Sequence, residues 1–350
     1  MCQQATPCGM RRPSKLFAGA ALLSSFVTAV TSADTDTDSS KRGIAYLGTN
    51  HNNDYNIFLS GQSPLTWYYN WSPYPVRNPS SFRNIEFVPL IHNIDSLPAD
   101  IRQLSNLPSS STHLLSFNEP DHGTSGGGSD ISPSDAAGAY IDSIAPLSVA
   151  NGGNFLISHP STTGTLSGLS WLRQFNTSCY AINTTHGCHT DFLATHFYGD
   201  FPALASWLGT LNEYYNTNTG SDLPIWITEL ALPQMSAQRT ERMMNTTLPY
   251  LDGLGYLGRY SWFGIFREEN ANEWTGDGVA LLDDSGDLTA LGAMYLGSGF
   301  AEGESANSSP GGSGGGGGGN KGGAVAVGGG SNLALVVGVG VLSCVVGSMV

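Results

Sequence analysis

Short runs of aliphatic, β-branched and aromatic residues alternate along this chain with longer segments in which apolar positions recur at helical spacing. The short runs predict eight strands, at residues 43–48, 66–71, 86–91, 113–118, 155–159, 192–198, 225–229 and 260–266. The longer segments predict helices at residues 96–107, 133–149, 167–175, 202–215, 236–251 and 288–296, and Ser132 before Pro133 is a typical helix start. The first two connections between strands are short and show little helical pattern. Strand and helix alternating over about 260 residues predict one α/β domain, residues 43–300, folded as a (β/α)8 TIM barrel and not as a doubly wound sheet.

The charge balance narrows the classes of partner. The chain has 14 basic and 28 acidic residues among 350, a formal net charge of −14, which disfavours nucleic acid and anionic membrane surfaces. No Gly-x-Gly-x-x-Gly or phosphate-binding loop opens a predicted helix, and the glycines at 126–128 follow no predicted strand. We therefore expect a neutral ligand, no cofactor, no metal and a monomeric protein.

The first 33 residues have the three parts of a secretory signal peptide. Arg11, Arg12 and Lys15 form a charged start, residues 16–30 an apolar stretch, and residues 31–33 a small-residue cleavage site. The apolar stretch is shorter than a helix that spans a bilayer, so a transmembrane anchor or a disordered start is the weaker alternative. Cleavage would leave an acidic leader, residues 34–42, before the barrel.

The other end of the chain resembles a tether followed by a removable anchor signal. Residues 301–332 are rich in glycine and serine, a composition typical of a disordered linker. Residues 333–350 are mostly apolar with no basic residue behind them, as in a glycosylphosphatidylinositol (GPI) attachment signal. Asn320 and Ser313 are both candidate attachment residues, and a plain tail anchor is the alternative. We expect a secreted protein held at the cell surface or cell wall by a GPI anchor in the plasma membrane.

Three of the five cysteines lie within the two terminal signals, so the mature chain keeps only Cys179 and Cys188. In the secretory compartment these two are expected to form a disulfide. The alternative is a zinc site with His186 and His189, but the crowded spacing lacks a zinc-finger pattern. Two glycosylation sequons flank the cysteine pair, which predicts that this segment lies at the surface. The sequons are at Asn70, Asn176, Asn183, Asn245 and Asn307.

Two of the predicted strands end in a glutamate. Glu119 follows the strand at 113–118 and precedes Pro120, which cannot donate to a sheet ladder, and Glu229 ends the strand at 225–229. In a parallel barrel such strand ends form the rim that carries the chemistry. Each glutamate alone could be a capping or salt-bridged residue. The pair favours catalysis, because glycoside hydrolysis uses one protonated and one ionised carboxyl group.

Aromatic residues gather at the same predicted strand ends. Tyr69 and Trp71 end the second strand, and Trp262 lies in the eighth. Because a barrel interior is filled mainly by branched aliphatic residues, aromatic rings beside carboxylates suggest a surface on which sugar rings stack. We therefore expect Trp262, Trp71 and Tyr69 to bind a carbohydrate, with a place in the core as the alternative.

Four segments, in this order along the chain, resemble the fungal alkali-sensitive-linkage-like glycosyl hydrolases, glycoside hydrolase family 128. The segments are Ser116-Phe-Asn-Glu-Pro-Asp121, Thr195-His-Phe-Tyr-Gly199, Trp226-Ile-Thr-Glu-Leu-Ala231 and Tyr260-Ser-Trp-Phe-Gly264. The resemblance covers the whole predicted barrel. It implies a (β/α)8 enzyme that hydrolyses β-1,3-glucan with retention, expected here to be endo-acting in fungal cell-wall remodelling.

The same resemblance implies roles for individual residues. Glu119 would be the acid/base and Glu229 the nucleophile. Asn118 would bond the sugar 2-hydroxyl, and Tyr198 would hold the nucleophile. His196 would line the same subsite, with a buried structural histidine as the alternative. Two other functions stay open: a glycosidase for β-1,6-glucan or a galactan, and a non-catalytic protein that binds wall glucan.

Overall fold

The computed structural model describes residues 40–48, 51, 53–59, 62–76, 85–297 and 299–304. The predicted signal peptide, most of the acidic leader, most of the tether, the sequon at Asn307 and the apolar tail lie outside the described residues. Contacts of the barrel reach slightly beyond its predicted limits. Lys41 Nζ donates to the backbone oxygens of Asp252 and Leu254 at 2.9 and 3.0 Å, and Leu288 N donates to Glu304 O at 2.7 Å.

Within the described residues, eight strands follow one another in the predicted order, and each overlaps one of the predicted runs. They are β1 (Arg42–Ala45), β2 (Trp67–Tyr69), β3 (Glu86–Phe87), β4 (His113–Leu114), β5 (Leu156–Ile157), β6 (Leu193–Tyr198), β7 (Ile225–Ala231) and β8 (Leu257–Trp262). The α-helices are α1 (Leu97–Leu104), α2 (Pro133–Ala139), α3 (Leu166–Ile182), α4 (Phe201–Asn212), α5 (Ala237–Gly253) and α6 (Ala290–Leu296). Within the described part of the chain, no helix combines the length and the apolar character needed to cross a bilayer.

Two helices, α2 and α3, differ most from their predicted lengths. Ser132 caps α2 as predicted, but the helix changes at Tyr140–Ile144 into a π-helical turn and then at Ala145–Leu147 into a 3-10 turn. Pro146 has no N–H with which to extend an α-helical ladder. α3 continues past residue 175 to Ile182.

The predicted disulfide between Cys179 and Cys188 is confirmed. Cys179 lies near the end of α3, so the bond joins this helix to the loop that leads into β6. Because the two sulfurs are bonded to each other, neither is a thiolate ligand for the alternative zinc site.

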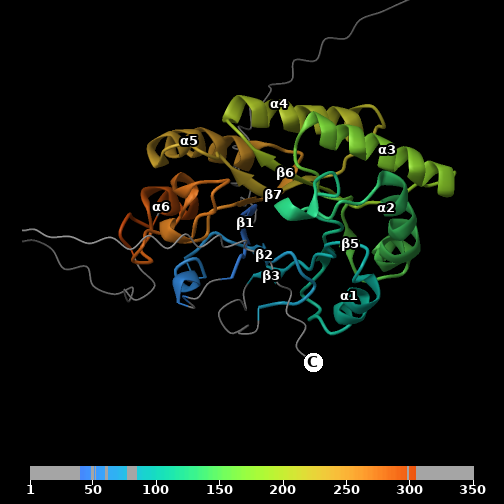
Figure 1. Cartoon of the computed structure of the whole chain (residues 1–350), viewed down its shortest axis with the longest axis horizontal. Helices are drawn as coiled ribbons and strands as arrows, with labels where there is room; N and C mark the ends of the chain where they lie inside the picture. Colours follow the sequence, from blue (N-terminus) through green and yellow to red (C-terminus); the bar gives the residue numbers. More distant parts are fainter. Residues whose placement is uncertain are drawn as a thin grey trace, which may run out of the picture. The chain divides into compact units, whose positions relative to one another are not determined.

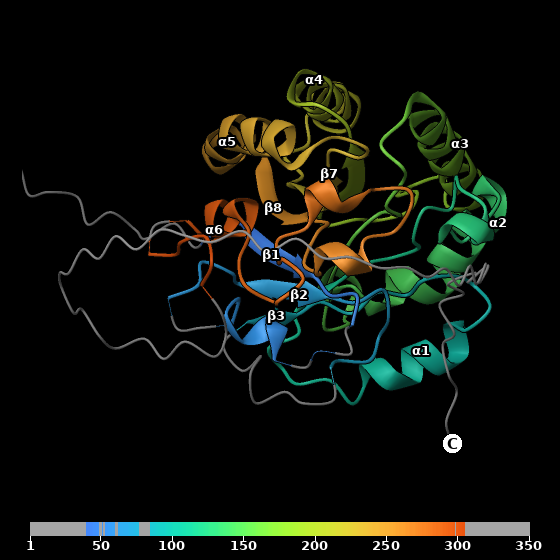
Figure 2. The ribbon, with the colours of Figure 1, turned by 60° about the vertical axis from the view of Figure 1, so that its left-hand side comes forward.

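Pairing between neighbouring strands closes the sheet into a barrel. Six strands pair in the order β3-β2-β1-β8-β7-β6, β4 pairs with β5, and every one of these pairs is parallel. Isolated parallel bridges join the two sets, Leu90 to Leu115 and Ser158 to Phe192. The helices lie around the outside of the strands (Figure 1 and, from another side, Figure 2). This closed parallel arrangement confirms the predicted (β/α)8 fold.

The inside of the barrel is filled largely by aromatic rings, which corrects the expectation of a mainly aliphatic interior. The interior cluster consists of Ala45, Trp67, Tyr69, Val88, Leu90, Leu115, Phe192, Ala194 and Trp226. Gly43 leaves room for one of the rings, because a Cβ at this position would lie 2.2 Å from Trp67. The Phe192 and Trp226 rings pack 4.2 Å apart. An aromatic residue in these strands is therefore not by itself a sign of a ligand surface.

The end of the barrel at which the strands begin is closed by a charged network. Glu86 accepts hydrogen bonds from Arg259 Nη2 at 2.7 Å and from His113 Nδ1 at 2.8 Å. The Arg259 guanidinium also lies over the ring of Trp226, 4.3 Å from its centroid. Burial alone would raise the pKa of Glu86, but the His113 hydrogen bond and the Arg259 charge outweigh it and lower the pKa to about 2. This network seals the apolar interior at the end opposite to the catalytic candidates.

The described sequons differ in how accessible their amide nitrogens are. Asn245 is exposed on α5, and Asn183 lies half-buried just after α3. Asn70 Nδ2 donates to Tyr74 O at 2.8 Å, and Asn176 Nδ2 donates to the Tyr214 hydroxyl at 2.9 Å. Since Nδ2 is the atom that carries a glycan, Asn245 offers the most accessible attachment position of the four.

Candidate active site

Glu119 lies just beyond β4, where the chain leaves the barrel. Its backbone N–H donates to Ser161 O at 2.7 Å, and the neighbouring Asn118–Ser161 bridge continues the β4–β5 pairing past the last strand residue. The φ angle of Glu119 is 39°, in the left-handed region that residues other than glycine rarely adopt. Strained backbone of this kind clusters at functional sites, where surrounding structure holds it in place. The turn aims the Glu119 carboxyl group into the barrel mouth.

Glu229 lies within β7, two residues before the end of the strand, and three donors hold its buried carboxylate. Trp71 Nε1 donates to Oε1 at 2.7 Å, and the Tyr69 hydroxyl donates to the same oxygen at 3.2 Å. The Tyr198 hydroxyl donates to the other oxygen, Oε2. Trp71 also has a left-handed backbone, with a φ of 54°. These hydrogen bonds fix the direction of the carboxylate and favour its ionised form.

The two strands that carry most of the site are irregular at this level. The β6–β7 register shifts between Thr195 and His196, and the β7–β8 register shifts between Ile227 and Leu230. Bulges of this kind re-aim the side chains beside them. They lie directly at His196 and Glu229, two of the residues that meet in the mouth.

His196 lies between the two glutamates and is completely buried. Its Nδ1 is 2.7 Å from Glu119 Oε1, and its Nε2 is 3.3 Å from Glu229 Oε1. One oxygen of each glutamate and one ring nitrogen all lie within 4.8 Å of one another. The structure therefore brings together Glu119, Glu229, His196 and Tyr198, as the sequence predicts.

Burial and charge move the pKa values of these groups in different directions. Burial alone would raise the pKa of Glu119, but the hydrogen bond and charge of His196 outweigh it, and the pKa lies below its ordinary value. Burial raises the pKa of Glu229, and the charge of Glu119 adds to this rise against the opposing effect of His196. Protons in the resting site are thus held less readily by Glu119 than by its neighbours. A general acid at Glu119 needs the opposite distribution, so the proton must reach it from a neighbouring group.

Glu119, His196 and Glu229 are the group of described residues whose ligand atoms lie close enough together for a metal ion. Their geometry fits a shared proton better. At 2.7 Å, His196 Nδ1 and Glu119 Oε1 are joined directly by a hydrogen bond. The other ring nitrogen, Nε2, lies 3.3 Å from Glu229 Oε1, close enough for an ion pair but without a hydrogen bond among the described residues. We therefore assign no metal to this site.

The loop after Glu119 orients Asn118. Asn118 Nδ2 donates to Gly127 O at 3.1 Å, while its Oδ1 is buried and accepts no hydrogen bond from the described residues. Gly128 allows the close turn, because a Cβ there would lie 2.2 Å from His122 O. The glycines at 126–128 thus belong to the loop of the fourth strand, which the sequence did not indicate. Asn118 Oδ1 is left as an acceptor for a hydroxyl group of a ligand.

The expectation of a sugar-binding face is wrong for Trp262 and Tyr69. Trp262 is 1% exposed and its Nε1 donates to Val279 O at 2.9 Å, so this last residue of β8 belongs to the core on the outer side of the barrel strands. Tyr69 is also fully buried and bonds Glu229, so its role is to support the carboxylate. Trp71 is half-buried, and its indole N–H faces Glu229. Alternation along a strand, which turns successive side chains to opposite faces, decides these outcomes.

Trp274, which the strand pattern does not single out, supplies an exposed aromatic ring at the mouth. It is 55% exposed, and its ring lies 4.3 Å from that of Tyr198 at 79°. The loop after β8 carries it, and Gln234 Nε2 holds this loop by donating to the backbone oxygens of Glu273 and Trp274 at 2.6 and 2.8 Å. The sequence signal was a tryptophan among polar loop residues, with no apolar periodicity to place it in the core.

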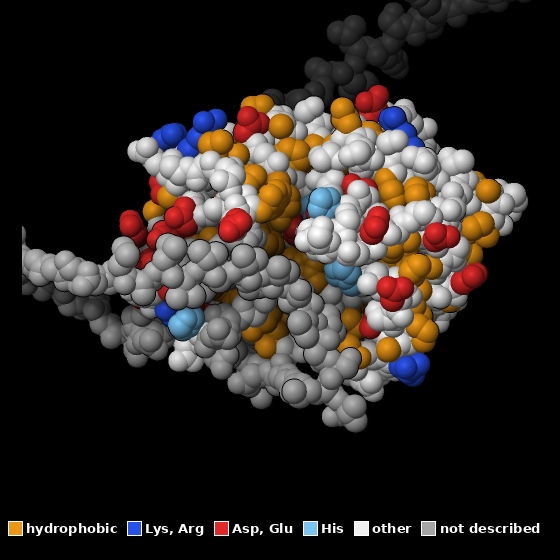
Figure 3. All heavy atoms as spheres, viewed as in Figure 1, with side chains coloured by type: hydrophobic (Ala, Val, Ile, Leu, Met, Phe, Trp, Pro, Cys, Tyr) orange, Lys and Arg blue, Asp and Glu red, His pale blue; other side chains and the backbone are white. Residues whose placement is uncertain are grey.

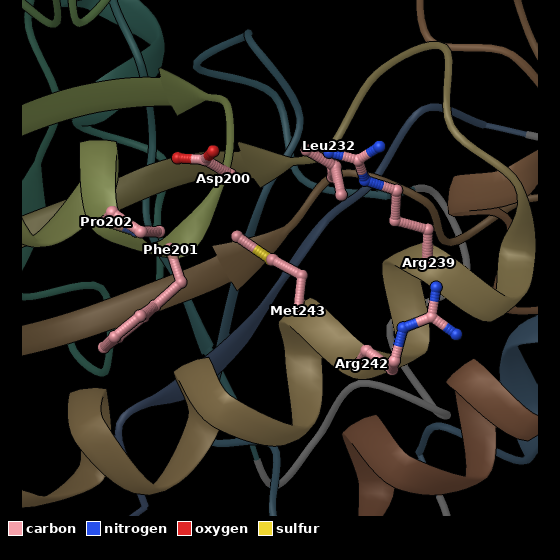
Figure 4. Close-up of a pocket in the computed structure, with 7 residues that line it drawn as sticks. All are labelled: Asp200, Phe201, Pro202, Leu232, Arg239, Arg242 and Met243. Atoms are coloured by element: carbon pink, nitrogen blue, oxygen red, sulfur yellow. The ribbon is translucent and has the colours of Figure 1, made fainter.

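On the face drawn in Figure 3, apolar and histidine side chains are exposed together near the middle, with acidic side chains around them. A separate depression of about 330 Å³ involves the start of α4, the end of β7 and α5 (Figure 4). It is lined by Asp200, Phe201, Pro202, Leu232, Arg239, Arg242 and Met243. Neither glutamate lines this depression, so we place the chemistry at the barrel mouth.

Known proteins match the part of the chain that forms the barrel. The model of the glycosyl hydrolase catalytic core matches residues 43–295. Alkali-sensitive linkage protein 1 of Schizosaccharomyces pombe is 33% identical over 268 residues, which cover 74% of this chain and 44% of that protein. The chain thus spans less than half the length of this curated relative.

Solved structures of glycoside hydrolase family 128 share the fold. A subgroup III curdlan-specific exo-β-1,3-glucanase from Blastomyces gilchristii is 27% identical, with a TM-score of 0.56 over 74% of this chain and 98% of that one. A subgroup II endo-β-1,3-glucanase from Pseudomonas viridiflava is 25% identical, with a TM-score of 0.59 over 75% and 99%. A subgroup VII oligosaccharide-binding protein from Trichoderma gamsii, 19% identical with a TM-score of 0.56 over 74% and 93%, shares the fold alone. Together with the family match, these folds show that the chain belongs to the glycosyl hydrolases, as a catalytic-core domain of the family 128 type.

Proposed function

We propose that the chain is a retaining glycoside hydrolase that cleaves β-1,3-glucan. The observation that carries the proposal is the facing pair Glu119 and Glu229, one oxygen of each lying within 4.8 Å of the other. Retaining enzymes place their carboxyl groups about 5–5.5 Å apart, whereas inverting ones need about 6.5–9.5 Å to admit a water. The family 128 relatives described as β-1,3-glucanases support the choice of substrate.

In this proposal Glu229 attacks the anomeric carbon while Glu119 gives a proton to the leaving oxygen. The hydrogen bonds from Trp71 and Tyr198 aim the Glu229 carboxylate before the attack. The sugar is then esterified to Glu229, and Glu119, now ionised, removes a proton from the water that releases it. Asn118 Oδ1 accepts a hydrogen bond from the sugar 2-hydroxyl.

A non-catalytic glucan-binding protein is the second candidate, favoured by the oligosaccharide-binding protein that shares the fold. Binding alone requires neither a strained backbone at Glu119 nor three donors on Glu229, and both features are present here. Hydrolysis is therefore the better-supported function. A glycosidase for β-1,6-glucan or a galactan would use the same two carboxylates. Hydrolysis assays on the separate polysaccharides distinguish it from a β-1,3-glucanase.

The first prediction concerns the substrate and the carboxylate pair. The mature protein is expected to release sugar from linear β-1,3-glucan and not from β-1,6-glucan or galactan, and the product lengths separate endo from exo cutting. Glu229→Gln should lower kcat/KM by about 10⁴-fold or more, because an amide cannot attack the anomeric carbon. Glu119→Gln should lower it most for poor leaving groups, which need the proton.

Glu302→Gln is the matched control, since Glu302 is an exposed glutamate close to the end of the described chain. Unfolding midpoints within about 2 °C of the parent would show that the variants are folded. Full activity in either active-site variant would sink the assignment. Binding of glucan by the parent protein without hydrolysis would establish the second candidate.

The second prediction is stereochemical. If a glycosyl-enzyme forms on Glu229, the first product from a β-linkage has the β configuration, because two displacements restore it. Proton NMR of the reducing end, recorded before mutarotation, measures this directly. An α anomer appearing first would contradict the retaining mechanism and leave the assignment of a hydrolase intact.

The third prediction concerns Trp274, which we propose as a stacking surface for a sugar ring. Trp274→Ala should weaken binding of a laminari-oligosaccharide by about 2- to 10-fold, the range expected for one aromatic contact. Calorimetry in the Glu229→Gln background measures binding without turnover. Trp262→Phe is the contrasting variant, expected to lower the unfolding midpoint and leave the affinity unchanged. Equal affinity with and without the Trp274 ring would remove it from the binding surface.

The fourth prediction concerns delivery, which we propose from the terminal segments of the sequence. The signal peptide at 1–33, the tether at 301–332 and the apolar tail at 333–350 would place the enzyme at the cell surface, GPI-anchored to the plasma membrane and close to wall glucan. Treatment of intact cells with a phosphatidylinositol-specific phospholipase should release active protein lacking the tail. Retention of protein that still carries Val350 would indicate a tail anchor instead.

A further inference from the structure

His196 is placed so that each nitrogen of its ring faces a different carboxylate. Nδ1 lies 2.7 Å from Glu119 Oε1, and Nε2 lies 3.3 Å from Glu229 Oε1. The side chain is fully buried, and its backbone N–H is fixed to Thr162 O at 3.0 Å. The ring therefore forms a row with the two glutamates, out of contact with solvent.

Counting protons along this row gives a definite result. A neutral imidazole has one N–H, so its other nitrogen presents a lone pair. If both glutamates were ionised and His196 were neutral with its proton on Nδ1, the Nε2 lone pair would lie 3.3 Å from the Glu229 carboxylate oxygen, buried and without a hydrogen bond, which is unfavourable. Two ionised carboxylates and a neutral imidazole hold one proton between them. The geometry therefore favours a second proton shared among these three groups.

We propose that His196 holds this proton as an imidazolium and supplies it to Glu119 for transfer to the leaving glycosidic oxygen. The inference rests on the proposed hydrolase function and deepens it. His196 touches neither the sugar nor the bond that breaks, so it is a positioning residue that acts through Glu119.

The step balances without any further reactant. The proton crosses from His196 Nδ1 to Glu119 Oε1, leaving a neutral ring and a protonated carboxyl group, which turns about its Cγ–Cδ bond toward the substrate. The proton then passes to the leaving oxygen as Glu229 attacks C1 and the C1–O bond breaks. In the second half, Glu119 takes a proton from water while the water oxygen displaces Glu229 from C1. That proton returns to His196 Nδ1, which restores the starting state.

The surroundings of the ring support this assignment. Burial alone would lower the pKa of His196, but the charges of Glu229 and Glu119 and the Glu119 hydrogen bond outweigh it, and the pKa is raised. The charge of Asp121 adds to this rise in the pKa of His196. His92 is a nearby histidine, and the charge of His196 lowers the pKa of its ring. The hydroxyls of Tyr69 and Tyr198 face Glu229, and burial raises the pKa of both, so they stay protonated donors.

The fifth prediction tests by enzyme kinetics whether His196 holds the proton and supplies it to Glu119. His196→Gln keeps a polar side chain but holds no proton, so only the carboxyl groups can then retain one. For laminarin, kcat/KM should fall by about 10²-fold or more, and its alkaline limb should move about one pH unit or more toward acid. For 2,4-dinitrophenyl β-laminaribioside, whose leaving group needs no proton, kcat/KM should change by less than about 5-fold. Equal losses on both substrates with an unmoved alkaline limb would mean that His196 is merely structural.

A second measurement uses the wild-type protein and does not depend on activity or on the folding of a variant. Nitrogen-15 NMR of the histidine rings at pH 7 should show both nitrogens of His196 protonated. His159 is the internal control, because it is equally enclosed but bonds Tyr215 and the Cys188 carbonyl, and burial lowers its pKa to about 4. Its ring should be neutral at the same pH. A neutral His196 would overturn the inference whether or not the protein hydrolyses glucan. An imidazolium in a protein inactive on every glucan would show that His196 holds the proton but would contradict its delivery to a leaving group, because the proposed function would then have failed.

Discussion

Two carboxylates with oxygens within 4.8 Å of each other, in a site largely closed to water, repel each other, and the mouth of this barrel is arranged around that repulsion. His196 lies between them and offsets the charge of both. Tyr198, Tyr69 and Trp71 offset the charge of Glu229 further by donating hydrogen bonds to it. These groups come from β2, β6 and the segment after β2, so only a closed barrel can assemble them. The two carboxylates are held close together despite this repulsion because both halves of the proposed reaction need both of them.

Holding this arrangement requires departures from regular structure, and they occur at one end of the barrel. Left-handed backbone is found at Glu119, Trp71 and Gln234, with φ values of 39°, 54° and 59°, and the strand register shifts beside His196 and Glu229. At the opposite end Glu86 and Arg259 form a paired network over the apolar interior. The barrel thus separates a strained end, which positions reactive groups, from an ion-paired end, which stabilises the fold.

The tryptophans show how one residue type takes different roles according to the face on which it lies. Trp67 fills the barrel interior, against the open space that Gly43 leaves. Trp262 packs on the outer side of the barrel strands, Trp71 turns its N–H to Glu229, and Trp274 is exposed beside Tyr198. Their side chains share size and a donor, so residue type alone cannot separate a core position from a ligand surface. Strand alternation and local backbone strain make that distinction.

The sequence by itself determined the order of the eight strands and six helices, because runs of β-branched and aromatic residues and helical spacing are local properties. It also determined the two glutamates, since Pro120 ends one strand pattern directly behind Glu119, and the disulfide, since only Cys179 and Cys188 lie outside the predicted terminal signals. Only the tertiary structure decided which aromatic rings face the mouth, that Trp274 is exposed there, and that His196 touches both carboxylates. The physical reason is that these outcomes depend on register shifts and on charges 77 and 33 residues away from His196 along the chain (196 − 119 and 229 − 196). Closing the barrel brings those charges within hydrogen-bonding distance, and no local pattern encodes that distance.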